Sequence, residues 1–316
     1  GQGAHRSCAR HVVSAASPDI VSTASPHWVE IRNAGNLGAK YKPGNFGVSG
    51  GVFTSYTPDY LSLGANGQLI EDLDDKNLTL TQGYGFNHDV IGRKNTPFAI
   101  FNRQLDVHAF SLGASRIVNP SLVVGLSGDF LVERGDQSKP YRYIPIFSPA
   151  DAAQVERGAS VESIAQKRLQ AKPLEQLPLE RNRLAISGRV AWRLSSSTIR
   201  VEERFYADTW GLKASTTDGR WLFDITDRLT LWPHLRVHVQ NGVDFWQRAY
   251  ASNGVHDIPA LRTSDREIGP LQTLGLGAGM RLALGKRGVS STIDDWALTT
   301  SLDGAYTSFA DTIYVK

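Results

Sequence analysis

The chain has 316 residues, a length that allows one large domain or two ordinary ones, and its 30 glycines exceed the average for this size. The formal net charge of +3 argues against a nucleic-acid binder that relies on a basic surface. The longest apolar runs fall short of the roughly 18 to 20 residues of a membrane-spanning helix, and the single cysteine, Cys8, has no partner for an intramolecular disulfide or a thiolate metal cluster.

Apolar residues alternate with polar or small residues along most of the chain. This period of two is typical of strands whose two faces meet different surroundings. Between residues 183 and 194, for example, Leu184, Ile186 and Val190 alternate with Arg183 and Arg189. The same pattern is found in residues 46–56, 78–89, 122–134, 183–208, 229–240 and 274–285. These segments approach the roughly 9 to 11 residues with which a tilted strand crosses a bilayer.

The connections between these segments are of two kinds. Short ones, typical of tight turns, lie at residues 42–45, 74–77, 118–121, 195–198, 226–228 and 285–288. Longer links lie around residues 60–66, 88–104, 135–181, 211–219 and 249–270. Short turns at one end and long loops at the other are typical of an outer-membrane barrel. We therefore predict an all-β fold, a transmembrane antiparallel β-barrel of about twelve strands.

The predicted strands run from near Trp28 to near Phe309. Residues 28–316 would form the barrel, and residues 1–27 an extracellular loop segment before it. This tracing places both chain ends on the long-loop side, whereas bacterial barrels keep both ends in the periplasm. We therefore expect one further strand at each end, and about fourteen strands in an intact barrel.

The longest link, residues 135–181, has features of its own. Val161, Ile164, Ala165 and Leu169 follow a helical spacing, and Ser148 and Ser160 are plausible helix starts. Such a loop would cap the mouth or fold into the lumen as a plug, and a disordered surface loop is the alternative. Tyr141, Arg142 and Tyr143 open the loop, and we predict that they anchor it inside the mouth.

Apolar and polar residues also alternate along the strands of a soluble β-sandwich, so the composition of the polar face is needed to distinguish it from a barrel. Here that face mixes glycine and serine with charged residues, which suits a water-filled lumen with little space for side chains. The residues predicted to line the lumen are Arg183, Arg189, Arg193, Arg200, Glu202, Arg204, Asp208, His234, Arg236 and His238. They would form either a structural ladder of charges or a selectivity field for anionic solutes.

Two further features bear on function. Glu203 interrupts the apolar face and predicts either a bulge or a protein contact through the wall. The chain has no P-loop, GxSxG, HExxH or CxxC motif. His234 and His238 could act as ligands or relay protons, but hydrated lumen residues are the favoured reading. We therefore expect no enzyme activity, no catalytic residue, no metal and no other cofactor.

Several segments resemble an uncharacterised family of predicted bacterial outer-membrane β-barrels. They are "SAASPDIVSTASP" (14–26), "PDYLS" (58–62), "KNLTLTQGYGFNHDVIG" (76–92), "GDQSKPYRYIPIF" (135–147) and "RTSDREIGPL" (262–271). In that family a strand precedes the first segment and another ends the chain on an aromatic residue, whereas this chain ends "IYVK". The genes of that family often lie near flavin-transferase and thioredoxin-like genes, which implies redox work at the cell envelope and identifies no catalytic residue.

The expected function is a channel in the bacterial outer membrane, or the barrel component of an envelope complex. A non-conducting scaffold that docks or sheathes a redox or secretion partner is the alternative, and an outer-membrane enzyme ranks below both. The expected partners are outer-membrane lipid and an envelope protein, with no nucleic acid.

Overall fold

The computed structural model describes residues 31–254, 257–284 and 296–313. Twelve strands form one antiparallel sheet, in which strands that follow one another in the sheet also follow one another along the chain. They are β1 (Asn33–Tyr41), β2 (Phe46–Thr57), β3 (Tyr60–Leu73), β4 (Leu78–Ile91), β5 (Arg103–Asn119), β6 (Leu122–Gly135), β8 (Glu180–Arg193), β9 (Ser197–Asp208), β10 (Lys213–Asp224), β11 (Leu229–Gln240), β13 (Leu271–Ala283) and β14 (Ala297–Phe309). Residues 1–27, predicted as a separate segment, and residues 285–288, predicted as a tight turn, lie outside the described residues.

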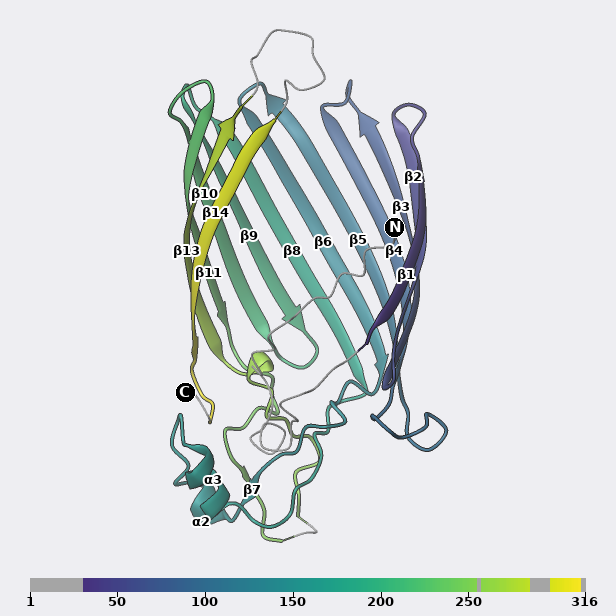
Figure 1. Cartoon of the computed structure of the whole chain (residues 1–316), viewed down its shortest axis with the longest axis vertical. Helices are drawn as coiled ribbons and strands as arrows, with labels where there is room; N and C mark the ends of the chain where they lie inside the picture. The colour runs from purple at the N-terminus through teal and green to yellow at the C-terminus, as the bar shows by residue number, and fades with distance from the viewer. Residues whose placement is uncertain (1–30, 255–256, 285–295, 314–316) are drawn as a thin grey trace.

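The sheet curves into the wall of a barrel with inclined strands, and β1 and β14 form its two edges (Figure 1). Tight turns follow β1, β3, β5, β8 and β10 at one end, whereas residues 136–179, 241–254 and 257–270 extend from the other. The prediction of a transmembrane antiparallel barrel of about twelve strands is thus confirmed. The predicted link at 60–66 is wrong, because these residues lie within β3, and the predicted link at 211–219 is wrong for residues 213–219, which lie within β10.

Neighbouring residues of the wall differ sharply in exposure. On β8, Ala185 and Ser187 are 4% and 9% exposed, whereas Leu184 and Ile186 are each 45% exposed. The small residues therefore lie on the concave inner face and the large apolar residues on the outer face. Leu112, Leu126, Phe205 and Leu276 continue this outer apolar surface, at 60–65% exposure. An apolar surface of this extent suits hydrocarbon and would be a liability in water.

The two long loops pack together into a separate unit, which we call the cap and define as residues 136–179, 241–254 and 257–270. It contains β7 (Ile146–Phe147), α2 (Pro149–Ala152), α3 (Val161–Lys167), β12 (Tyr250–Ala251) and η1 (Arg266–Ile268). Ser148 and Ser160 cap the two helices as predicted. The labelled parts of the cap lie beyond the loop-side ends of the strands (Figure 1), so the long loop caps the mouth instead of entering the lumen as a plug.

Glu203 lies on the outer face of β9 without distorting the sheet. It pairs in register with Gly188 of β8 and Thr217 of β10, and the pairing stays continuous on both sides, so the predicted bulge is absent here. Its carboxylate accepts hydrogen bonds from Ser215 Oγ at 2.6 Å and Thr217 Oγ1 at 2.5 Å. These hydroxyls give the carboxylate polar partners within the apolar surface.

The assignment of faces can be tested with two arginine substitutions. Ile186 lies mid-strand on the outer face, so Ile186→Arg is expected to destabilise the barrel by about 2–4 kcal/mol in phospholipid bilayers, as a cation at the bilayer midplane does. Ser127→Arg is the matched control, because Ser127 is exposed on the inner face. Urea unfolding of the refolded variants measures both effects, and equal losses of stability in the two variants would contradict the assignment.

Candidate functional site

The inner face of the barrel has two regions of different chemistry. Along β3 to β6 it carries many small or neutral side chains, such as Asn66, Thr81 and Ser127. Along β8 to β11 it is strongly charged. The charged side chains there are Arg181, Arg183, Arg189, Arg193, Arg200, Arg204, Arg220 and Arg236, with the carboxylates of Glu202, Asp208, Asp218 and Asp224.

All the predicted lumen residues lie on the charged inner face of β8, β9 and β11. The register places Arg183 opposite Asp208 and Arg189 opposite Glu202. Asp218 and Arg220 of β10 belong to the same surface and are missed from the sequence, because Thr, Asp and Gly in residues 211–219 predict a link. A signal for this strand was present in the sequence. Asp218 and Arg220 alternate with outward Trp221, in a segment as long as the neighbouring strands.

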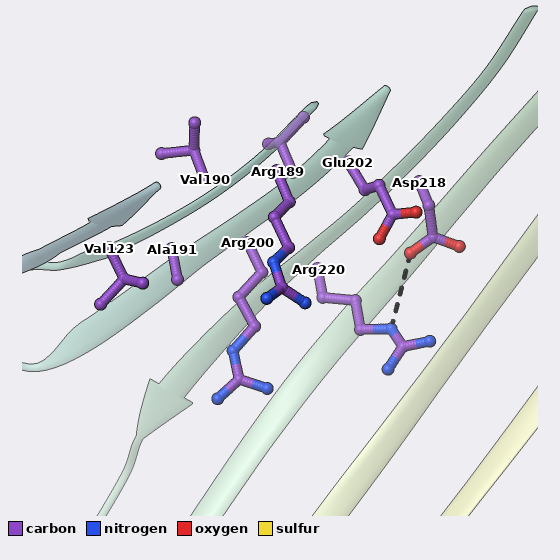
Figure 2. Close-up of a pocket in the computed structure, with 9 residues that line it drawn as sticks. Val123, Arg189, Val190, Ala191, Arg200, Glu202, Asp218 and Arg220 are labelled. Atoms are coloured by element: carbon purple, nitrogen blue, oxygen red, sulfur yellow. Dashed lines mark ion pairs between the residues drawn. The ribbon is translucent and has the colours of Figure 1, made fainter. Parts of the chain in front are cut away.

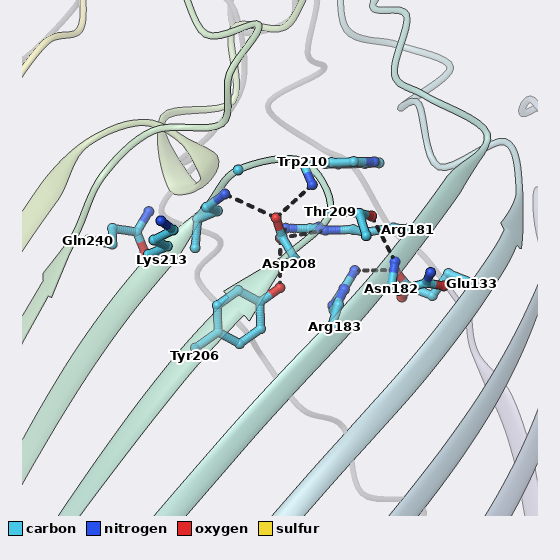
Figure 3. A network of polar contacts seen from close by, with 12 residues as sticks. Glu133, Arg181, Asn182, Arg183, Tyr206, Asp208, Thr209, Trp210, Lys213 and Gln240 are labelled. Atoms are coloured by element: carbon cyan, nitrogen blue, oxygen red, sulfur yellow. Dashed lines mark hydrogen bonds and ion pairs between the residues drawn. The ribbon is translucent and has the colours of Figure 1, made fainter.

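Asp208 is the centre of a polar network at the mouth (Figure 3). Its carboxylate accepts from Arg181 Nε at 2.8 Å and Nη2 at 2.5 Å, and from the Tyr206 hydroxyl at 2.8 Å. The backbone amides of Trp210 and Leu212 donate to its other oxygen at 2.9 and 3.0 Å. The Arg181 guanidinium also lies 4.1 Å from the centre of the Trp210 ring. This network is closed on itself and fixes the β9–β10 turn.

Three predicted arginines have carboxylate partners that differ from their register neighbours. Arg183 pairs with Glu133 of β6 at 2.8 Å, although Asp208 lies opposite it on β9. Arg193 pairs with Asp224, two strands away. Arg204 reaches Asp129 of β6 at 3.7 Å, across the small residues Ala185 and Ser187 of β8. None of these three pairs joins directly facing residues of β8 and β9, where the sequence predicts a charge ladder; they connect β8 to β6 and β10, and β9 to β6.

The two histidines of β11 each have polar partners on the inner face. His234 lies between two carboxylates, with Nε2 at 2.9 Å from Asp218 and Nδ1 at 2.6 Å from Asp303 of β14. Arg236 Nη1 also approaches Asp218 at 3.3 Å. His238 contacts Thr216 at 2.7 Å and Gln240 at 3.1 Å. The two histidines therefore have separate partners. Within the described part of the chain, no group of three or more His, Cys, Asp or Glu residues is arranged to hold a metal ion.

Two predicted arginines differ from the others because no carboxylate pairs with them among the described residues. They are Arg189 and Arg200, which line a pocket of about 360 Å³ on the inner face together with Arg220 (Figure 2). Arg220 Nε approaches Asp218 at 3.7 Å. Glu202 borders the same pocket. The pocket therefore brings together the least neutralised cations of the charged region.

The predicted loop anchors lie in the cap. Arg142 is buried between Glu175 at 2.9 Å and Asp265 at 2.7 Å, so one cation joins both loops of the cap. The Tyr141 hydroxyl donates to Asp59 at 2.8 Å and accepts from the Lys94 amide at 2.6 Å. Tyr143 forms an isolated bridge with Leu174. Tyr141 thus ties the cap to two wall connections, while Arg142 holds the cap itself together.

Burial changes the pKa values of these cap groups. Burial alone would lower the pKa of Arg142, but the adjacent Glu175 and Asp265 outweigh it and raise the pKa. Burial raises the pKa of Tyr250 to about 12, and its hydroxyl stays protonated while donating to the Phe245 carbonyl at 2.9 Å. The cap therefore combines one buried, always charged cation with a buried neutral phenol.

An apolar outer wall around a polar interior, built from twelve antiparallel strands, defines an outer-membrane β-barrel. The family described as "protein of unknown function (DUF3570)" matches residues 4–295, so the chain belongs to it, and the predicted membership of an uncharacterised barrel family is confirmed. The protein is located in the bacterial outer membrane, in contact with its lipid. No helix in the described ranges is sufficiently long and apolar to span a membrane.

Solved structures of outer-membrane proteins are similar to the chain. The ferric citrate transporter FecA in its unliganded form is 13% identical, with a TM-score of 0.49, over 89% of this chain and 43% of FecA. The siderophore receptor PirA from Acinetobacter baumannii is 10% identical, with a TM-score of 0.47, over 86% of this chain and 48% of PirA. A BenF-like porin from Pseudomonas fluorescens Pf-5 is 8% identical, with a TM-score of 0.35, over 89% and 88%. The chain thus spans less than half the length of the first two. No curated protein matches it in sequence.

The role of Arg142 in the cap gives a testable expectation. Arg142→Gln leaves the fully buried Glu175 without its cation, and breaking such a pair costs about 3–5 kcal/mol. Hydrogen exchange in residues 136–179 should therefore accelerate strongly while the strands of the wall stay protected. Arg157→Gln is the control in the same loop, because Arg157 contacts only the exposed Ser308 hydroxyl at 3.1 Å among the interactions described. A cap that stays protected without Arg142 would contradict this role.

Proposed function

We propose that the protein is a channel for small polar solutes across the outer membrane, alone or as the barrel of an envelope complex. The observation that carries the proposal is a polar inner face with open space. Besides the arginine pocket, a second pocket of about 320 Å³ lies on the inner face, among residues that include Thr81, Gly113 and Ser127. The labelled parts of the cap lie beyond the strand ends (Figure 1). The proposal assigns the protein no chemical reaction.

The size of the wall also supports a passage. Barrels of about eight strands enclose an interior that side chains can fill, and the diameter grows with strand number. The twelve strands of this wall make a wider enclosure. Its small side chains along β3 to β6, such as Gly83, Ser111 and Gly113, occupy little of that space. A solute could therefore pass between the small residues and the charged region.

Conductance in planar bilayers tests this proposal. The refolded protein is expected to open discrete channels. In a Cys8→Ser background, a charged methanethiosulfonate should reduce the conductance of Ser127→Cys, because Ser127 faces the interior. Leu126→Cys is the matched control, since the adjacent Leu126 is 61% exposed on the lipid-facing side and should be left unmodified. A protein without conductance, or a Ser127→Cys variant that never reacts, would overturn the proposal.

The second candidate is a scaffold that docks an envelope partner without conducting. Glu203 favours it, because a carboxylate on the lipid-facing wall is expensive to keep and its hydroxyl partners Ser215 and Thr217 make a polar spot there. A protein contact at that spot would remove the carboxylate from lipid. A silent barrel that copurifies with a partner, and loses it in Glu203→Leu, would support the scaffold over the channel.

A further inference from the structure

Three cations share one pocket of about 360 Å³ on the inner face of β8, β9 and β10 (Figure 2). Arg200 and Arg220 stand directly opposite each other in the register of β9 and β10. Like charges in directly opposite positions destabilise a sheet. Arg189 of β8 extends over Gly125 of β6, where a Cβ would lie 2.5 Å from the Arg189 Nε atom. The wall therefore accepts a repulsive pair and has a glycine where Arg189 needs space.

The same face neutralises its other arginines. Arg181 and Arg183 have carboxylate partners at 2.5 and 2.8 Å, and Arg193 also pairs with a carboxylate. Arg189 and Arg200 have none among the described residues. Asp218, which lies 3.7 Å from Arg220, is shared with His234 and Arg236 at shorter distances. The pocket thus has an excess of positive charge that the wall itself does not balance.

A purely structural ladder would bring Glu202 into contact with Arg189, its direct register partner. No ion pair joins them in the described structure, and Glu202 instead borders the pocket with Asp218. The small side chains of Val123 and Ala191 also line the pocket and leave it open. Guanidinium groups recognise carboxylate and phosphate groups through two parallel hydrogen bonds. The arrangement therefore matches a multiply charged anion that enters from water.

We propose that Arg189, Arg200 and Arg220 form a binding site for a small divalent oxyanion, carried by a phosphorylated or polycarboxylic solute. Glu202 and Asp218 lie at the border of the site, where they accept hydrogen bonds from hydroxyl or ammonium groups of the same solute. This inference rests on the water-filled lumen of the proposed function, but binding does not require the barrel to conduct.

Calorimetric titration of the folded, detergent-solubilised chain tests the site. The probes are inorganic phosphate and succinate at constant ionic strength, with chloride as the monovalent comparison. At least one dianion is expected to bind, and Arg200→Gln should weaken it about tenfold to a hundredfold, as expected for the loss of a charge-assisted hydrogen bond. The probe that binds with the higher affinity indicates whether the site prefers a phosphate or a carboxylate ligand.

Arg281→Gln is the control, because Arg281 lies on the inner face of β13, opposite Thr230, and outside the pocket. It should change the affinity less than about twofold, since it removes an equal charge without a contact to the ligand. Arg200→Lys keeps the charge and is expected to bind with intermediate affinity. A shift to higher thermal midpoint with the bound dianion, absent in Arg200→Gln, provides a second readout.

The proposal is overturned if neither dianion binds the unaltered chain, or if Arg200→Gln and Arg281→Gln weaken binding equally. A barrel that binds the dianion through Arg200 but never conducts would overturn the channel and leave this site standing. A barrel that conducts without binding either probe would overturn this site and leave the channel standing.

Discussion

The structure depends on the need to hydrogen-bond every backbone amide within hydrocarbon, where water cannot serve as a partner. Adjacent strands meet this need by pairing along the sheet, whose two edges are β1 and β14, and in the described sheet the register shifts only between Ile117 and Asn119, beside a tight turn. Because the register is constant, successive residues of a strand point to opposite faces of the wall. Each residue of a strand therefore faces either lipid or the interior, and a shift by one position would exchange the faces.

This constraint reverses the usual distribution of apolar residues. The wall places its large apolar side chains outside, so the buried apolar residues gather in the cap and at the loop-side strand ends, as Ile146, Phe147, Ile164 and Trp210 show. The cap has too few such residues for a large core. Polar interactions therefore hold much of the cap together, above all the ion pairs of Arg142 between the two loops. Glu175 also accepts a hydrogen bond from the Thr263 hydroxyl at 2.6 Å.

The period of two was sufficient to predict the fold class and the faces of β8 and β9, because most outward side chains there are large and apolar, while the inward ones are charged, polar or small. It failed in β3, whose inner Ser62, Gly64 and Asn66 are small or neutral, and in β10, whose outer Ser215, Thr217 and Gly219 lack large apolar side chains, because both segments then resemble a loop. That failure also concealed Asp218 and Arg220. The ion pairs could not be predicted either, because long arginine side chains reach across a strand, as Arg204 does to Asp129, while register specifies only direct neighbours.

The arginines of the inner face fall into two groups with different roles. Where a guanidinium meets a carboxylate within a closed network, as Arg181 meets Asp208, removing either group would leave a buried charge, and the pair serves the wall. Where guanidinium groups face one another across the register, as Arg200 and Arg220 do, the wall gains nothing from their charge. Removing such a repulsion should cost little stability. Charged residues such as these do not stabilise the sheet but line an open pocket. Their charge is therefore expected to act by contacting a bound solute.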